Sequence, residues 1–70
     1  MNKETNFETL ADRLRHERVK RKLTRAELGK AIGHPKPLIY LWETGQIVLN
    51  EKILADLAEY FGISINEFLR

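Results

Sequence analysis

The sequence predicts an all-α domain of five short helices, and three observations lead to that prediction. Apolar residues recur at the three- and four-residue spacing of helices, polar residues that cap helices precede several of these segments, and glycines follow three of them. No segment has the alternation of apolar and polar residues that is typical of a strand. Because 70 residues suffice for only one small core, we expect a single domain over residues 1–70, with residues 1–6 flexible and 7–70 folded.

The first expected helix covers residues 7–21. Its apolar residues fall on one helical stripe and comprise Phe7, Leu10, Ala11 and Leu14. The charged residues between and after this stripe are expected to face water: Asp12, Arg13, Arg15, Glu17, Arg18, Lys20, Arg21 and Lys22.

The second expected helix, 25–32, is bounded by residue types that begin and end helices. Thr24 and Glu27 have the spacing of a capping box, in which the hydroxyl and the carboxylate each satisfy a free backbone amide. Gly33 ends the helix, because glycine adopts the left-handed conformation without penalty.

The third expected helix starts in the stretch P-K-P and ends before Gly45. Pro35 has no hydroxyl with which to cap a helix, and proline disfavours helical backbone in the residue before it. We therefore expect Lys36 to be extended or to be the N-cap. Pro37 would take the first helical position, where its missing amide costs nothing.

The remaining chain predicts two more helices after an extended connection, Q-I-V-L-N. Asn50 is expected to cap the helix 51–61, whose apolar residues keep helical spacing until Gly62. Ser64 is expected to cap a last turn or two, 65–69, in which Phe68 and Leu69 fold back on the core.

Composition bounds the function. The chain has no cysteine, and its two histidines and its carboxylates form no ligand spacing, so we expect neither a disulfide nor a metal site nor a cofactor. The polar start and the lack of a long apolar run predict a soluble, cytoplasmic protein that neither crosses nor binds a membrane. No nucleophile and base form a recognisable motif, so we do not expect an enzyme.

Charge is distributed unevenly along the chain. Residues 1–36 carry a formal charge of +5, whereas residues 37–70 carry −3. This asymmetry favours an anionic partner on one side of the domain.

The stretch T-R-A-E-L-G-K-A-I-G-H-P-K-P-L-I-Y-L-W-E-T-G, residues 24–45, has the layout of a helix-turn-helix formed by the second and third helices. It resembles the Cro/repressor-type domains, also called XRE-like or lambda-repressor-like. The closing G-I-S-I-N-E-F-L is similar to the end of those domains, so the resemblance covers about residues 7–70. It implies a five-helix DNA-binding domain of a transcriptional regulator, of the kind found in phage or bacterial repressors or in their N-terminal modules.

The resemblance also implies roles for individual residues. The third helix would enter the major groove of double-stranded DNA, and the DNA-binding positions would be Thr24, Arg25, Lys36, Pro37, Leu38, Tyr40, Leu41 and Thr44. Arg25, where the family commonly has Gln, would contact a backbone phosphate, and Arg18 would pair with Glu43 as a structural contact. Lys22 stands where relatives often have Gly, so we expect mild strain in that turn.

The third helix offers few hydrogen-bond donors for reading bases, and two interpretations follow. In the first, Pro37, Leu38 and Leu41 contact thymine methyl groups while Lys36 reaches a guanine or a phosphate. The operator would then be palindromic, bound by a weak homodimer or by a dimer that forms on DNA. In the second, an apolar patch binds another protein, and that patch would comprise Leu38, Leu41, Ile47 and Val48, with Leu49 and Val48 each open to burial in the core instead.

Overall fold

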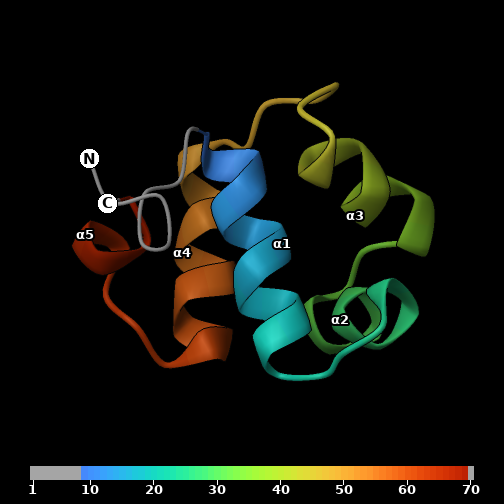
Figure 1. The fold of residues 1–70 in the computed structure, drawn as a ribbon, viewed down its shortest axis with the longest axis horizontal. Coiled ribbons are helices and arrows are strands. Elements are labelled where there is room, and N and C mark those ends of the chain that lie inside the picture. The colour runs from blue at the N-terminus through green and yellow to red at the C-terminus, as the bar shows by residue number, and fades with distance from the viewer. Residues whose placement is uncertain (1–8, 70) are drawn as a thin grey trace.

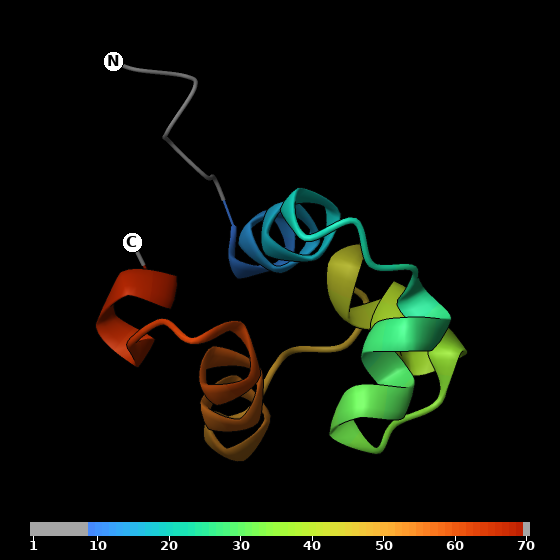
Figure 2. The same ribbon diagram turned by 90° about the horizontal axis from the view of Figure 1, so that it is seen from below.

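The computed structural model describes residues 9–69, and these form five helices. They are α1 (Leu10–Lys20), α2 (Arg25–Ile32), α3 (Lys36–Glu43), α4 (Glu51–Phe61) and α5 (Ile65–Phe68). In Figure 1, α2 and α3 lie at one end of the molecule and α5 at the other, with α1 and α4 between them. The view from below keeps this order (Figure 2). Within residues 9–69 no helix has both the length and the apolar character needed to cross a membrane.

The core gathers the apolar stripes of all five helices. Its buried members are Leu14, Leu28, Ile39, Trp42, Leu49, Leu54, Leu57, Ala58, Phe61 and Phe68. Trp42 is only 4% exposed, as its place on the stripe of Ile39 predicts, and its ring meets that of His34 edge to face at 5.2 Å. The core therefore fixes α3 from its inner side and leaves its outer side free to act as a surface.

Most predicted helix ends are confirmed. The Thr24 hydroxyl accepts from the Glu27 amide at 3.0 Å, and the Glu27 carboxylate accepts from the Thr24 amide at 2.8 Å, which completes the capping box. The side chain of Asn50 caps α4 by accepting from the amide of Ile53 at 2.9 Å. Gly62, at φ +74°, ends α4 in the left-handed conformation.

Two predicted helix starts are wrong. The expectation for α1 was a start at Phe7, which lies outside the described residues, but Thr9 is the N-cap and its hydroxyl accepts from the Asp12 amide at 3.1 Å. In α3, Lys36 is the first helical residue and Pro35 the N-cap. The carbonyl of Pro35 accepts the first bonds of the helix, and Pro37 fits the second position because no amide is required in the first turn.

The predicted exposure of two charged residues in α1 is also wrong. Glu17 is 2% exposed and Arg18 is 8% exposed. Both are buried because each has ionic partners within the protein, and burial of a charge is tolerated only with such pairing.

Candidate nucleic-acid interface

The turn between α2 and α3 is fixed by two glycines. Gly33 ends α2 at φ +82°, a conformation that other residues rarely adopt. A β-carbon on Gly29 would lie 2.3 Å from the carbonyl oxygen of His34, so only glycine lets the turn fold back against α2. The close neighbours of Gly29 are therefore backbone atoms of the turn and of the start of α3.

A buried ionic cluster ties α3 to both preceding helices. Arg18 of α1 donates to both carboxylate oxygens of Glu43, at 2.5 and 3.1 Å, and to the carbonyl of Leu23 at 2.7 Å. Arg25 of α2 donates from Nε to the same carboxylate at 3.0 Å. The side chain of Glu43 is 1% exposed. This cluster joins α3 to α1 and α2, and it contains the Arg18–Glu43 pair that the resemblance implied.

Three of the residues predicted to read DNA lie exposed on the outer side of α3. They are Lys36, Pro37 and Tyr40, and Tyr40 is 46% exposed. Leu38 and Leu41 are only partly buried, and Leu38 packs against the core. The expectation that Leu38 points outward is therefore wrong, because with α3 starting at Lys36 it lies four residues before Trp42, on the buried side of the helix.

A hollow of about 320 Å³ joins the start of α2 to the start of α3. Its lining residues are Arg18, Thr24, Arg25, Ala26 and Lys36, three of which are cationic. Lys36 is exposed, and none of the described residues forms an ion pair or hydrogen bond with its amine. The Thr24 hydroxyl accepts within the capping box and keeps its proton for another acceptor. The hollow thus combines positive charge with donors, as an anion site requires.

Thr44, predicted at the far end of α3, is exposed and engaged within the protein. Its hydroxyl donates to the carbonyl of Tyr40 at 3.0 Å and accepts from the Gln46 side-chain amide at 2.9 Å. It follows that Lys36 and Tyr40 are the polar side chains of α3 that are exposed without being engaged in this way, although Tyr40 also stacks with Arg25.

Comparisons with known proteins agree with this geometry. Residues 14–68 match the family model described as helix-turn-helix. The chain belongs to this helix-turn-helix family. The P22 c2 repressor, solved in complex with a synthetic operator, is 28% identical with a TM-score of 0.81, and the match covers 91% of this chain and 97% of that one. The predicted all-α, lambda-repressor-like fold and the resemblance to Cro/repressor-type domains are thereby confirmed.

The same helix-turn-helix fold occurs within an enzyme. Hydroxypropylphosphonic acid epoxidase from S. wedmorenis is 26% identical with a TM-score of 0.78, and the match covers 87% of this chain but 32% of the epoxidase. The chain thus spans about a third of that protein. No curated protein matches the sequence. Because one fold serves a repressor and part of an epoxidase, function has to be argued from the residues of the site.

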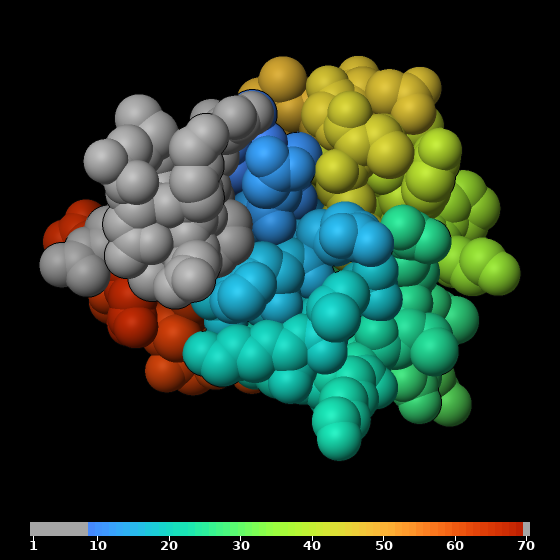
Figure 3. All heavy atoms as spheres, viewed as in Figure 1, coloured from blue at the N-terminus to red at the C-terminus, as the bar shows by residue number. Residues whose placement is uncertain are grey.

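The loop that follows α3 is only partly apolar at its surface. Figure 3 shows α3 and this loop along one edge of the helix-turn-helix domain. Val48 is 85% exposed and Ile47 is 42% exposed, whereas Leu49 is 8% exposed and belongs to the core. The apolar patch expected from the sequence is therefore reduced to Ile47 and Val48, with Leu41 at its margin.

A second ionic cluster joins α1 to α4 rather than to α3. Arg21 donates to Glu17 at 2.6 Å and to the carbonyl of Phe61 at 2.7 Å, and Arg13 donates to Glu17 at 2.7 Å. Burial raises the pKa of Glu17, but these hydrogen bonds outweigh it and hold the pKa below its ordinary value. The spacing of Arg13, Glu17 and Arg21, four residues apart, is the signal by which this cluster could have been predicted.

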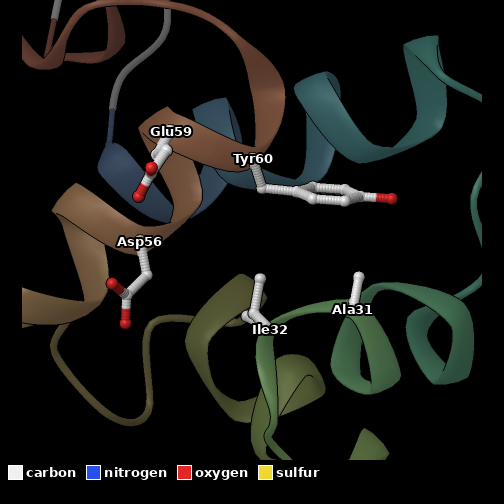
Figure 4. Close-up of a pocket in the computed structure, with 5 residues that line it drawn as sticks. All are labelled: Ala31, Ile32, Asp56, Glu59 and Tyr60. Carbon is white, nitrogen blue, oxygen red and sulfur yellow. The ribbon is translucent and has the colours of Figure 1, made fainter.

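A hollow of about 390 Å³ lies between α2 and α4, and Figure 4 shows five residues that line it. Tyr60 reaches across a floor of Ala31 and Ile32, with Asp56 and Glu59 on the α4 side. Asp56 already accepts from Lys52 at 3.1 Å. Within residues 9–69, no group of three or more metal-ligating side chains comes together.

Proposed function

We propose that this helix-turn-helix domain is a sequence-specific DNA-binding transcriptional regulator of the repressor kind, which inserts α3 into the major groove of double-stranded DNA. The observation that carries the proposal is the continuity of the cationic hollow with the exposed edge of α3. The similarity to a repressor bound to an operator supports it independently. B-DNA's major groove admits one α-helix, and phosphates flank that groove on both sides.

The residues divide into two kinds of contact. We assign phosphate contacts to Lys36, Thr24 and Arg25, which border the hollow at the starts of α2 and α3. Thr44, at the far end of α3, would reach a phosphate only by giving up the hydrogen bond from its hydroxyl to the Tyr40 carbonyl. Pro37 offers only carbon atoms, so its contribution to base reading would be contact with thymine methyl groups. The partly buried Leu38 and Leu41 would contribute at most the margin of this apolar surface.

Regulation would follow from occupancy of a promoter. One domain presents one reading helix, so a palindromic operator read by two copies has half-sites about 34 Å apart, one turn of the double helix. The second copy would join weakly in solution or on the DNA. Function by occupancy requires no catalytic residue and no cofactor, and it places the protein in the cytoplasm, where the operator is.

The first test is selection from random duplexes, followed by fluorescence anisotropy at two salt concentrations. We expect one palindromic motif to be enriched and its affinity to fall steeply as salt rises. Lys36→Ala should lower affinity and reduce the slope of log K against log salt by about 0.9, the value for one lost phosphate contact. Lys52→Ala removes an exposed lysine of α4 that is paired with Asp56, and it should leave the slope unchanged. Equal slopes for all three proteins would contradict the assignment of Lys36.

The second test concerns apolar reading of bases. Replacing single thymines of the selected operator by uracil removes only the C5 methyl group. Affinity should fall at the one or two thymines that meet Pro37 and should stay constant elsewhere. Operators that bind equally well with every thymine replaced would exclude methyl contacts as a source of specificity.

A second candidate function is protein binding, and the exposed side chains of Ile47 and Val48 favour it. The connection from 46 to 50 also has no Lys or Arg with which to contact phosphate. Under this alternative the protein should exceed the monomer mass without DNA, and Val48→Lys should restore the monomer. A monomer at high concentration, with intact operator binding, would exclude the alternative.

A further inference from the structure

Arg25 is held between two residues of α3. Its Nε donates to the buried carboxylate of Glu43 at 3.0 Å, and its guanidinium carbon lies 5.1 Å from the centre of the Tyr40 ring. The side chain is 34% exposed. An arginine that only contacted phosphate would need no partner within the protein. The guanidinium of Arg25 is instead held by Glu43 and Tyr40, both in α3.

The anchor of Arg25 is itself rigid. Glu43 is 1% exposed and accepts two hydrogen bonds from Arg18, which also donates to the carbonyl of Leu23. The contacts therefore run from α1 through Glu43 to Arg25 and end at the ring of Tyr40. A guanidinium lying over an aromatic ring attracts it and limits the rotamers that the ring can adopt.

We propose that Arg25 is a positioning residue, which holds the ring of Tyr40, and that Tyr40 is the residue of α3 that determines specificity through its hydroxyl. The inference rests on the proposed function and deepens it. The resemblance implied only a phosphate contact for Arg25. Under the present proposal the selectivity of DNA binding, and not only its strength, depends on this side chain.

The chemistry of the exposed residues supports this division. Lys36 donates only, and its flexible stem lets it serve many acceptors, so it discriminates poorly between bases. Pro37 has no polar atom to offer. A tyrosine hydroxyl donates and accepts, so it can pair with the O6 or N7 of guanine, the O4 of thymine, or an amino group of adenine or cytosine. Which of these it meets depends on where the ring is held.

Two conservative variants separate positioning from charge. Tyr40→Phe keeps the ring and its stacking on Arg25 but removes the hydroxyl. Arg25→Lys keeps the positive charge but loses the planar group that bonds Glu43 and stacks on Tyr40. Tyr60→Phe is the matched control, because Tyr60 is exposed to a similar degree, 44%, on α4.

Each protein is titrated by anisotropy against the selected operator and against operators with one base pair exchanged, at two salt concentrations. Tyr40→Phe should lower discrimination at one base pair of each half-site by about two- to tenfold, the range for one hydrogen bond. Arg25→Lys should lower discrimination at that same pair by about two- to fivefold, while the salt slope stays as in the wild type. Tyr60→Phe should change neither.

The double variant Tyr40→Phe, Arg25→Lys tests whether Arg25 acts through the hydroxyl of Tyr40. With Tyr40→Phe already present, Arg25→Lys should have no further effect on discrimination, because there is no hydroxyl left to position. An equal effect of Arg25→Lys in both backgrounds, or a loss of affinity with no loss of discrimination, would overturn the inference and leave Arg25 as a phosphate contact. A wild-type protein that selects no motif would instead refute the proposed function, and this inference with it.

NMR of the free protein tests the positioning role even if the Arg25→Lys variant is less stable. In the free protein, Arg25→Lys should shift the NMR signals of the Tyr40 ring and leave those of Tyr60 in place. Unchanged Tyr40 signals would overturn the positioning role, whatever the variant does to stability.

Discussion

Replacing Glu43 by Gln should remove a large part of the stability of this domain. Gln is nearly isosteric with Glu, so the substitution keeps the shape of the side chain. It removes the carboxylate charge that faces Arg18 and Arg25. Breaking a buried ion pair by removing one partner costs about 3–5 kcal/mol. At 0.05–0.15 kcal/mol per residue, the whole domain is expected to have about 3.5–10 kcal/mol of unfolding free energy.

Urea unfolding, followed by far-UV circular dichroism and by Trp42 fluorescence, measures this loss. Asp56→Asn is the matched control: it makes the same change of carboxylate to amide in the pair with Lys52, whose side chain is 80% exposed. An exposed pair of this kind contributes at most about 0.5 kcal/mol. If Glu43→Gln and Asp56→Asn destabilise the domain equally, the ionic cluster does not hold α3 in place.

Three further predictions concern single positions. Gly29→Ala should destabilise by at least about 1–3 kcal/mol, because its β-carbon would meet a backbone carbonyl at 2.3 Å, and an unchanged melting temperature would refute the tight turn. Lys22→Gly should stabilise by up to about 1 kcal/mol, because Lys22 has φ +59°, whereas Lys20→Gly within α1 should destabilise. The pKa of Glu17 is lowered in the folded protein, so its contribution to stability is present at neutral pH and is lost as the pH falls below about 4. In urea titrations at several pH values, Glu17→Gln should therefore reduce the dependence of the unfolding free energy on pH in the acid range.

Much of the fold could be predicted because its signals are local. A capping box needs only two residues three apart, so the start of α2 could be predicted from Thr24 and Glu27. A left-handed helix end needs only a glycine, so the ends of α2 and α4 could be predicted from Gly33 and Gly62. Apolar stripes gave the core in the same way, including the burial of Trp42.

The burial of Glu17 and Arg18 could not be predicted from the apolar stripe, because charged residues beside such a stripe are expected to face solvent. Glu17 and Arg18 are buried only because partners from other turns or other helices reach them. The predicted start of α3 is wrong because one local preference was given too much weight. A residue before proline disfavours helical backbone, but Lys36 is nevertheless the first helical residue, since Pro37 in the first turn needs no amide. The stacking of Arg25 on Tyr40 joins residues from two helices and leaves no trace in the sequence.

The two prolines that open α3 have a thermodynamic consequence for recognition. A ring that fixes φ reduces the number of conformations open to the unfolded segment, so less entropy is lost when the helix forms. With Pro35 as N-cap and Pro37 in the first turn, less entropy is lost on forming α3, which favours a helix already formed in the free protein. The heat capacity change of association should therefore match the apolar area covered by contact alone, without the larger contribution that accompanies a segment that folds on binding.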